Sequence, residues 1–137
     1  MEFEFNVEGG NFIKAGTASS QLKKILKQLN VDPKITKRVV VALYEAEVNI
    51  VAHAYTGIVY ITITTDQIFI RLVDEGPGIP DIDLAMQTGY STASSEVREM
   101  GFGAGMGLPN IKNNCDVLNI TSEVDKGTIV ELTFFLN

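Results

Sequence analysis

The chain has little of several residue types that mark particular protein classes. It contains one cysteine, Cys115, in 137 residues, which excludes an intramolecular disulfide framework and a cysteine-rich zinc site. It has 11 lysines and arginines against 17 aspartates and glutamates, a formal net charge of −6. A nucleic-acid binder needs a basic surface to neutralise phosphates, so this balance argues against that class. A local phosphate site made of backbone N–H groups needs no net positive charge and is not excluded.

Long apolar runs and a basic leader are also missing. No run reaches the roughly 18 apolar residues that a membrane-spanning helix needs, and the start, MEFEFNVEGG, has acidic residues where a signal peptide has basic ones. We therefore expect a cytoplasmic protein with no membrane contact. The length fits a single domain over residues 1–137, and 45% hydrophobic residues are enough for a real core.

Hydrophobic periodicity predicts strands and helices in alternating pairs. Thr17 or Ser19 is expected to cap the first helix and Asp32, followed by Pro33, the second. The predicted order is β-α-α-β-β-α-α-β-β, which favours an α+β fold: a two-layer sandwich with a mixed, mostly antiparallel sheet and helices on one face. Strands are expected at 2–7, on either side of residues 66–67, at 117–123 and at 128–136, and helices within 17–30, at 33–54, within 76–87 and at 108–115.

The segment GFGAGMGLPNIKNN, residues 101–114, has glycine at every second position up to Gly107 and then becomes helix-forming. A glycine-rich loop that opens a helix exposes unpaired N–H groups and the positive end of the helix dipole, which suits an anion. A Walker A loop is excluded because the chain has no Gly-Lys pair, and a dinucleotide fingerprint would need glycine where Leu108 stands. A plain flexible loop remains the alternative. Cys115, which follows, is expected in the core of the helix as an inert thiol.

A second cluster lies in the helix predicted at 33–54. Glu45, Asn49 and His53 are spaced four residues apart, which places them on one stripe of the helix. Such a stripe is poor core material unless something polar faces it, and a solvated helix face is the alternative. His53 fits either a nucleotide site or a satisfied histidine near the helix end. Glu47 falls on a different face and is expected to be exposed.

A third cluster, RLVDEGPGIP, places Asp74 at the end of an apolar strand with Gly76 and Gly78 just beyond. Ordinary turn chemistry would explain this cluster by itself. In chain order, however, E-x-x-x-N on a helix, D-x-G-x-G-I after a strand, G-x-G-x-G-L before a helix and the pair Gly127-Thr128 resemble the Bergerat ATP-binding fold of gyrase, MutL and the histidine kinases. The resemblance covers essentially the whole chain.

Within that superfamily, the free-standing domain resembles the anti-sigma-factor and stressosome-associated serine/threonine kinases. DEGPGIPDIDLAMQTGYST and MGLPNIK are similar to the stressosome-associated branch, while SSEVREMG is closer to the anti-sigma branch, so the branch is left open. The resemblance implies that ATP and Mg²⁺ are the cofactors. It also implies that the substrate is a STAS-domain regulator in a partner-switching circuit, with a sigma factor as a further partner and a homodimer left open.

The resemblance also implies a role for individual residues. Glu45 would be the general base, Asn49 the Mg²⁺ ligand, Asp74 the acceptor for the adenine amino group, and Thr128 its support. Arg98 would reach the γ-phosphate or remain a surface charge, the two readings being left open. The remaining residues that the resemblance assigns to the nucleotide site are Gly76, Gly78, Ile79, Gly103, Gly105, Gly107 and Leu108.

These roles predict an ATP- and Mg²⁺-dependent protein serine/threonine kinase. The alternative is a nucleotide-gated binding module that holds a sigma factor or another regulator with little phosphotransfer. Glu45 favours the kinase, because a pure binder has no need of a base. An ATPase component of a larger machine is a third reading.

Overall fold

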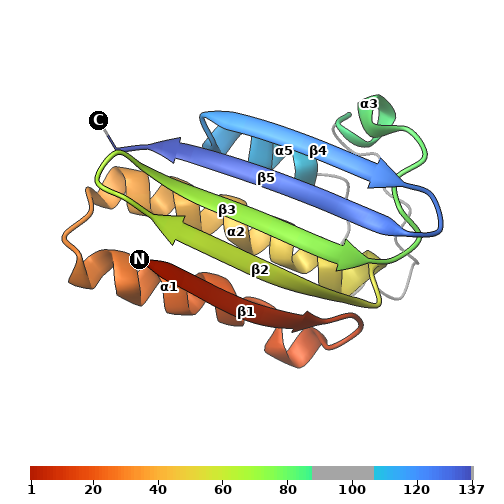
Figure 1. The fold of residues 1–137 in the computed structure, drawn as a ribbon, viewed down its shortest axis with the longest axis horizontal. Helices are drawn as coiled ribbons and strands as arrows, with labels where there is room; N and C mark the ends of the chain where they lie inside the picture. Colours follow the sequence, from red (N-terminus) through yellow and green to blue (C-terminus); the bar gives the residue numbers. More distant parts are fainter. Residues whose placement is uncertain (88–106, 137) are drawn as a thin grey trace.

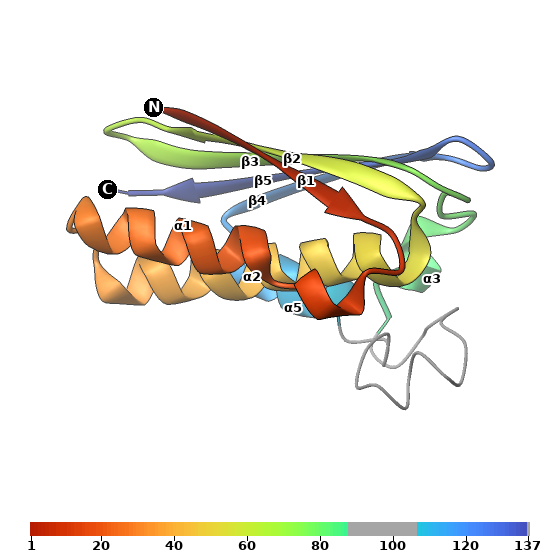
Figure 2. The same cartoon turned by 90° about the horizontal axis from the view of Figure 1, so that it is seen from below.

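Five strands form one sheet in the order β1-β2-β3-β5-β4, and helices cover one of its faces (Figures 1 and 2). The computed structural model describes residues 1–87 and 107–136. The strands are β1 (Glu2–Glu8), β2 (Thr56–Ile63), β3 (Gln67–Glu75), β4 (Val117–Glu123) and β5 (Gly127–Phe135). The helices are α1 (Thr17–Gln28), α2 (Pro33–His53), α3 (Ile82–Ala85) and α5 (Gly107–Asn114), with a short 3₁₀ turn, η1, at Phe12–Lys14.

The strands follow from alternating sequence. In β2 the buried side chains occur at every second position and face the helices, and the hairpin to β3 pairs Ile63 with Ile68. The α+β sandwich predicted from the order of elements is therefore confirmed. The sheet is more uniform than the mixed sheet expected, since every pairing among the described strands is antiparallel. The reason is that β5 inserts between β3 and β4, so these two parallel strands are not neighbours.

The helix layer is built around α2, which packs between α1 and α5 (Figure 2). The start of α2 is as predicted: the Asp32 side chain accepts the backbone N–H of Lys34 at 2.8 Å, and Pro33 occupies the first helical position. None of the helices in the described part of the chain is both long and apolar enough to cross a membrane. The core lies between the two layers, and its fully buried members include Leu22, Leu43, Ile70, Leu132 and Phe134.

The start of α1 differs from the prediction that Thr17 or Ser19 caps it. The N-cap residue is Gly16, whose φ of 91° is left-handed and which has no side chain to cap the helix. Thr17 is the first helical residue, and its hydroxyl donates to the carbonyl of Lys14 at 2.6 Å instead. The first N–H groups of α1 find their acceptor elsewhere in the fold, as described below.

Candidate functional site

The second motif of the sequence brings polar groups to the side of α2 that meets α5. Glu45, Asn49 and His53 lie along α2 and are all half-buried. A Cβ added to Gly107, the first residue of α5, would lie 2.9 Å from Asn49 Oδ1 and 3.2 Å from Nδ2. The backbone that opens α5 therefore passes directly against the Asn49 amide. Two motifs 58 residues apart in the chain, Asn49 and Gly107, meet at this point.

The start of α5 carries the described part of the glycine-rich motif. Its first N–H groups have no acceptor within the helix and provide the donors expected for an anion. Leu108 packs against the core, which anchors this end of α5. Gly103, Gly105 and Arg98 lie outside the described residues, so the phosphate contacts assigned to them stay predictions.

At the third motif, Asp74 ties the end of β3 to the start of β5. The backbone N–H of Thr128 donates to Asp74 Oδ1 at 3.1 Å. Burial raises the pKa of the Asp74 carboxyl above its ordinary value, and the N–H of Thr128 opposes that rise. Among the described residues no donor is directed at the second oxygen, Oδ2, so this oxygen is available to a ligand.

The hydroxyl of Thr128 does not support Asp74 directly. Its Oγ1 lies 2.8 Å from Ser122 Oγ, and Ser122 Oγ also accepts the N–H of Ile79 at 2.7 Å. The Thr128 support for Asp74 comes from its backbone, while its hydroxyl joins Ser122 and Ile79. The sequence interpretation missed Ser122, although strand alternation places it on the helix side of β4, directly opposite Thr128 in register.

The glycines after β3 are required by close packing. Gly78 has φ 77°, and a Cβ there would collide with the carbonyl oxygen of Glu123. A Cβ on Gly76 would lie 3.0 Å from Ala54 Cα, at the C-terminus of α2. The loop that carries Asp74 is thus seated against the end of α2 on one side and the β4–β5 turn on the other. The Asp74 group and the Asn49 group belong to one end of the sandwich.

The described residues contain no group of three or more histidine, cysteine, aspartate or glutamate side chains that could hold a metal ion alone. Mg²⁺ fits this site in another way, because it takes one or two protein oxygens and completes its shell with waters and phosphate oxygens. Asn49 Oδ1, beside the start of α5, is such an oxygen. The donor set therefore suits a nucleotide-bound Mg²⁺ and does not suit a metal held by protein alone.

Glu47 is not exposed, contrary to the sequence expectation. The residue is only 2% exposed, and its carboxylate accepts the N–H groups of Gly16, Ala18 and Ser19, each at 3.1 Å. Burial raises its pKa, while the three N–H groups act in the opposite direction. A signal existed in the sequence: Leu43 lies four residues before Glu47 and Ile50 three after, so Glu47 continues the buried face of α2.

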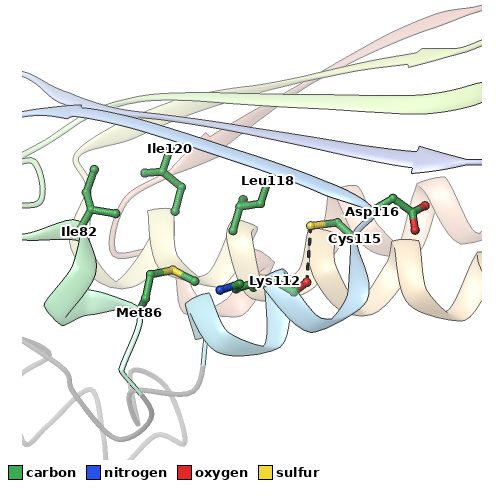
Figure 3. Close-up of a pocket in the computed structure, with 7 residues that line it drawn as sticks. All are labelled: Ile82, Met86, Lys112, Cys115, Asp116, Leu118 and Ile120. Atoms are coloured by element: carbon green, nitrogen blue, oxygen red, sulfur yellow. Dashed lines mark hydrogen bonds between the residues drawn. The ribbon is translucent and has the colours of Figure 1, made fainter.

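A separate cavity of 390 Å³ lies between α3, α5 and β4 (Figure 3). Cys115 lies at its wall, one residue beyond the end of α5 and partly buried, which corrects the expectation of a core position within the helix. Burial raises the pKa of its thiol, consistent with the inert thiol expected. The lining residues are Ile82, Met86, Lys112, Cys115, Asp116, Leu118 and Ile120.

Comparisons with known proteins identify the family and the fold of this domain. The family model for the histidine kinase-like ATPase domain matches residues 13–134. The chain is 37% identical over 100 residues to an anti-sigma F factor of Caldanaerobacter subterraneus, with 69% of this chain and 66% of that protein covered. It is 31% identical to the serine/threonine-protein kinase RsbT of Bacillus subtilis, covering 83% and 84% of the two chains. The RsbU and RsbW domains of Rv1364c from Mycobacterium tuberculosis share the fold, with a TM-score of 0.66 at 17% identity over 98% of this chain and 32% of that one.

Proposed function

The chain belongs to the histidine kinase-like ATPase domain family, and we propose that it is an ATP- and Mg²⁺-dependent serine/threonine kinase. Its substrate is a STAS-domain regulator of a partner-switching circuit. The observation that carries the proposal is the contact between Asn49 and Gly107, one helical turn after Glu45. In this contact the Asn49 side chain lies against the N-terminus of α5, and Glu45 precedes Asn49 by one turn on the same stripe of α2. The similarity to the kinase RsbT over most of both chains supports the same activity.

The nucleotide is held at both ends of the site. Asp74 Oδ2 accepts a hydrogen bond from the amino group of adenine, while Gly76 and Gly78 let the loop after β3 pass close to the base. At the other end Asn49 Oδ1 would hold the Mg²⁺ ion, and the first N–H groups of α5 would bind phosphate oxygens. When bound, Mg²⁺ would supply positive charge that offsets the charge developing on the phosphates during transfer.

Glu45 acts on the attacking hydroxyl group. Phosphoryl transfer asks the protein mainly to position its reactants, and a carboxylate within hydrogen-bond reach orients the serine or threonine and accepts its proton. Glu45 precedes Asn49 by one turn on the same stripe of α2, so both side chains are directed toward the same end of the site. This pairing supports a base beside the phosphate end rather than beside the adenine end.

A second candidate function rests on the similarity to anti-sigma F factors. In this reading the nucleotide-bound protein is a binding module that holds a sigma factor or another regulator without significant phosphotransfer. Retention of a sigma factor that depends on ATP, with no transfer of phosphate by the wild type, would favour this function over the kinase.

The test measures transfer from γ-labelled ATP with Mg²⁺ to a STAS-domain protein encoded near the gene. Label should appear on a serine or threonine of the acceptor with the wild type and disappear with Glu45→Gln, which is isosteric, while ATP affinity is retained. Glu4→Gln, an exposed carboxylate on β1, is the matched control and should leave transfer unchanged. Persistent transfer by Glu45→Gln would assign the base elsewhere, and ATP binding without transfer by the wild type would favour the binding module.

A further inference from the structure

Glu47 makes a contact that the proposed chemistry does not use. A carboxylate from the middle of α2 accepts three backbone N–H groups at the start of α1, those of Gly16, Ala18 and Ser19. The first N–H groups of a helix need such acceptors, and here the chain that precedes α1 provides no side-chain cap. The carboxylate of Glu47 supplies the cap from another helix.

The position of Glu47 on α2 relates it to the candidate site. It lies two residues after Glu45 and two before Asn49, so it points about 200° around the helix from each and lies within about 3 Å of them along the axis. One side of α2 therefore meets α1 through Glu47, and the opposite side meets Gly107 of α5 through Asn49. At the level of the site, α2 therefore contacts α1 on one side and α5 on the other.

Burying the Glu47 carboxylate costs free energy, because the charged group loses its hydration. An apolar side chain at this position would avoid the desolvation of a charge, and its contacts would tolerate rotation of the helix. Three hydrogen bonds to fixed backbone donors are directional, so they do not tolerate rotation of the helix. At Gly16 the backbone has a left-handed φ of 91°, and a Cβ there would lie 3.1 Å from the ring of Tyr44, another side chain of α2. The arrangement is suited to fixing the rotation of α2 about its own axis.

A small rotation is enough to matter at the site. Side-chain tips lie roughly 5–6 Å from a helix axis, so a rotation of about 10° moves them by about 1 Å. A displacement of that size at reacting groups costs on the order of 100-fold in rate. Ground-state nucleotide binding, which also uses Asp74 on the sheet, is less sensitive to the same rotation.

We propose that Glu47 is a positioning residue for phosphotransfer: by binding the N-terminus of α1 it fixes the rotation of α2, and so fixes where Glu45 and Asn49 point. The inference rests on the proposed kinase function. It adds a residue outside the nucleotide site, on the far side of the helix that carries the base and the metal ligand.

The experiment compares Glu47→Leu and the milder Glu47→Gln with Leu26→Ala, a destabilising control in the core of α1. Phosphotransfer is measured per folded molecule, at a temperature well below the unfolding transition of each variant. The KM for ATP and the NMR resonance of the Asn49 side-chain amide are measured alongside. We expect kcat to fall about 30- to 100-fold for Glu47→Leu, with KM changed less than about threefold and the Asn49 resonance shifted. Leu26→Ala should lose stability but keep kcat and the resonance.

A purely structural role for Glu47 predicts a different result. Lowered stability with kcat unchanged per folded molecule, or an equal fall of kcat in Leu26→Ala, would overturn the inference. Should Glu47→Leu fail to fold, Glu47→Gln is judged by the same criteria, since it retains the shape and one acceptor oxygen. A wild type that transfers no phosphate defeats the proposed function instead. The Asn49 resonance then tests the structural part of the inference: a shift supports the fixing of α2 by Glu47, and no shift rejects it.

Discussion

Replacing Asp74 by asparagine should weaken ATP binding strongly and reduce the preference for adenine. The structure gives the two carboxylate oxygens different surroundings: Oδ1 accepts the N–H of Thr128 at 3.1 Å, and no donor among the described residues is directed at Oδ2, the oxygen proposed to accept from adenine. An asparagine that keeps its oxygen toward Thr128 presents its NH₂ group to the adenine amino group, so that two donors face each other. The flipped side chain accepts from adenine but leaves the N–H of Thr128 without its acceptor.

Either orientation loses one hydrogen bond to a charged acceptor. Such a bond contributes about 1.5–3 kcal/mol, which corresponds to a roughly 10- to 150-fold rise in the Kd for ATP. The Kd for GTP should change much less, because guanine carries a carbonyl oxygen where adenine carries the amino group, and the NH₂ of asparagine can donate to it. Selectivity for ATP over GTP should therefore fall.

Isothermal titration calorimetry with ATP and with GTP measures both effects. Asp116→Asn is the matched control, since Asp116 also accepts a backbone N–H, that of Phe135 at 2.8 Å, but on the surface beside the cavity. It should bind both nucleotides as the wild type does. An unchanged Kd for ATP in Asp74→Asn, or a wild type that binds GTP as tightly as ATP, would refute the role given to Asp74.

Three further predictions concern stability. Burial lowers the pKa of His53 below 6.5, so the unfolded chain binds a proton more readily than the folded one. The free energy of unfolding, measured in urea, should therefore fall as the pH drops below about 6.5. His53→Gln should lack this decrease. The ion pair between Arg38 and Asp116, 3.1 Å long and partly exposed, should show a coupling of no more than about 1 kcal/mol in a double-mutant cycle of alanine variants measured at neutral pH. Gly78→Ala should lower the free energy of unfolding by at least about 1–2 kcal/mol, because alanine is strained at this left-handed φ. It should also bind ATP more weakly, and thermal unfolding with and without nucleotide measures both effects. Stability equal to that of the wild type would contradict the packing against Glu123.

The predictable parts of the fold are those fixed by neighbouring residues. Asp32 and Pro33 start α2 within one turn of chain, and alternation on both sides of residues 66–67 defines the hairpin of β2 and β3. The predicted cap of α1, Thr17 or Ser19, was wrong because the helix is capped by Glu47, about 30 residues further along the chain. A rule that searches for a cap next to the helix cannot find a carboxylate that arrives from another helix.

The site shows the same division between local and distant determinants. Asp74, Asn49 and the glycines could be named because they lie in short motifs with a characteristic order. Their contacts could not be derived, since the bond from Thr128 to Asp74 spans 54 residues and depends on β5 pairing with β3. Ser122 has no motif around it, and only the strand register, which places it opposite Thr128, gives it a role.

The strand order has a consequence for how the chain reaches its native state. Four of the five strands form two local hairpins, β2–β3 and β4–β5, which join along β3 and β5, while β1 pairs with the outer edge of β2. The hydrogen bond from Thr128 to Asp74 crosses the seam between β3 and β5. Closing it requires distant segments to meet, a slow kind of event in folding. A nucleotide that binds at Asp74 can recognise the chain only after closure, so it stabilises the joined state by mass action. Acquisition of ATP affinity during refolding should therefore coincide with the joining of the two hairpins, later than the formation of either one.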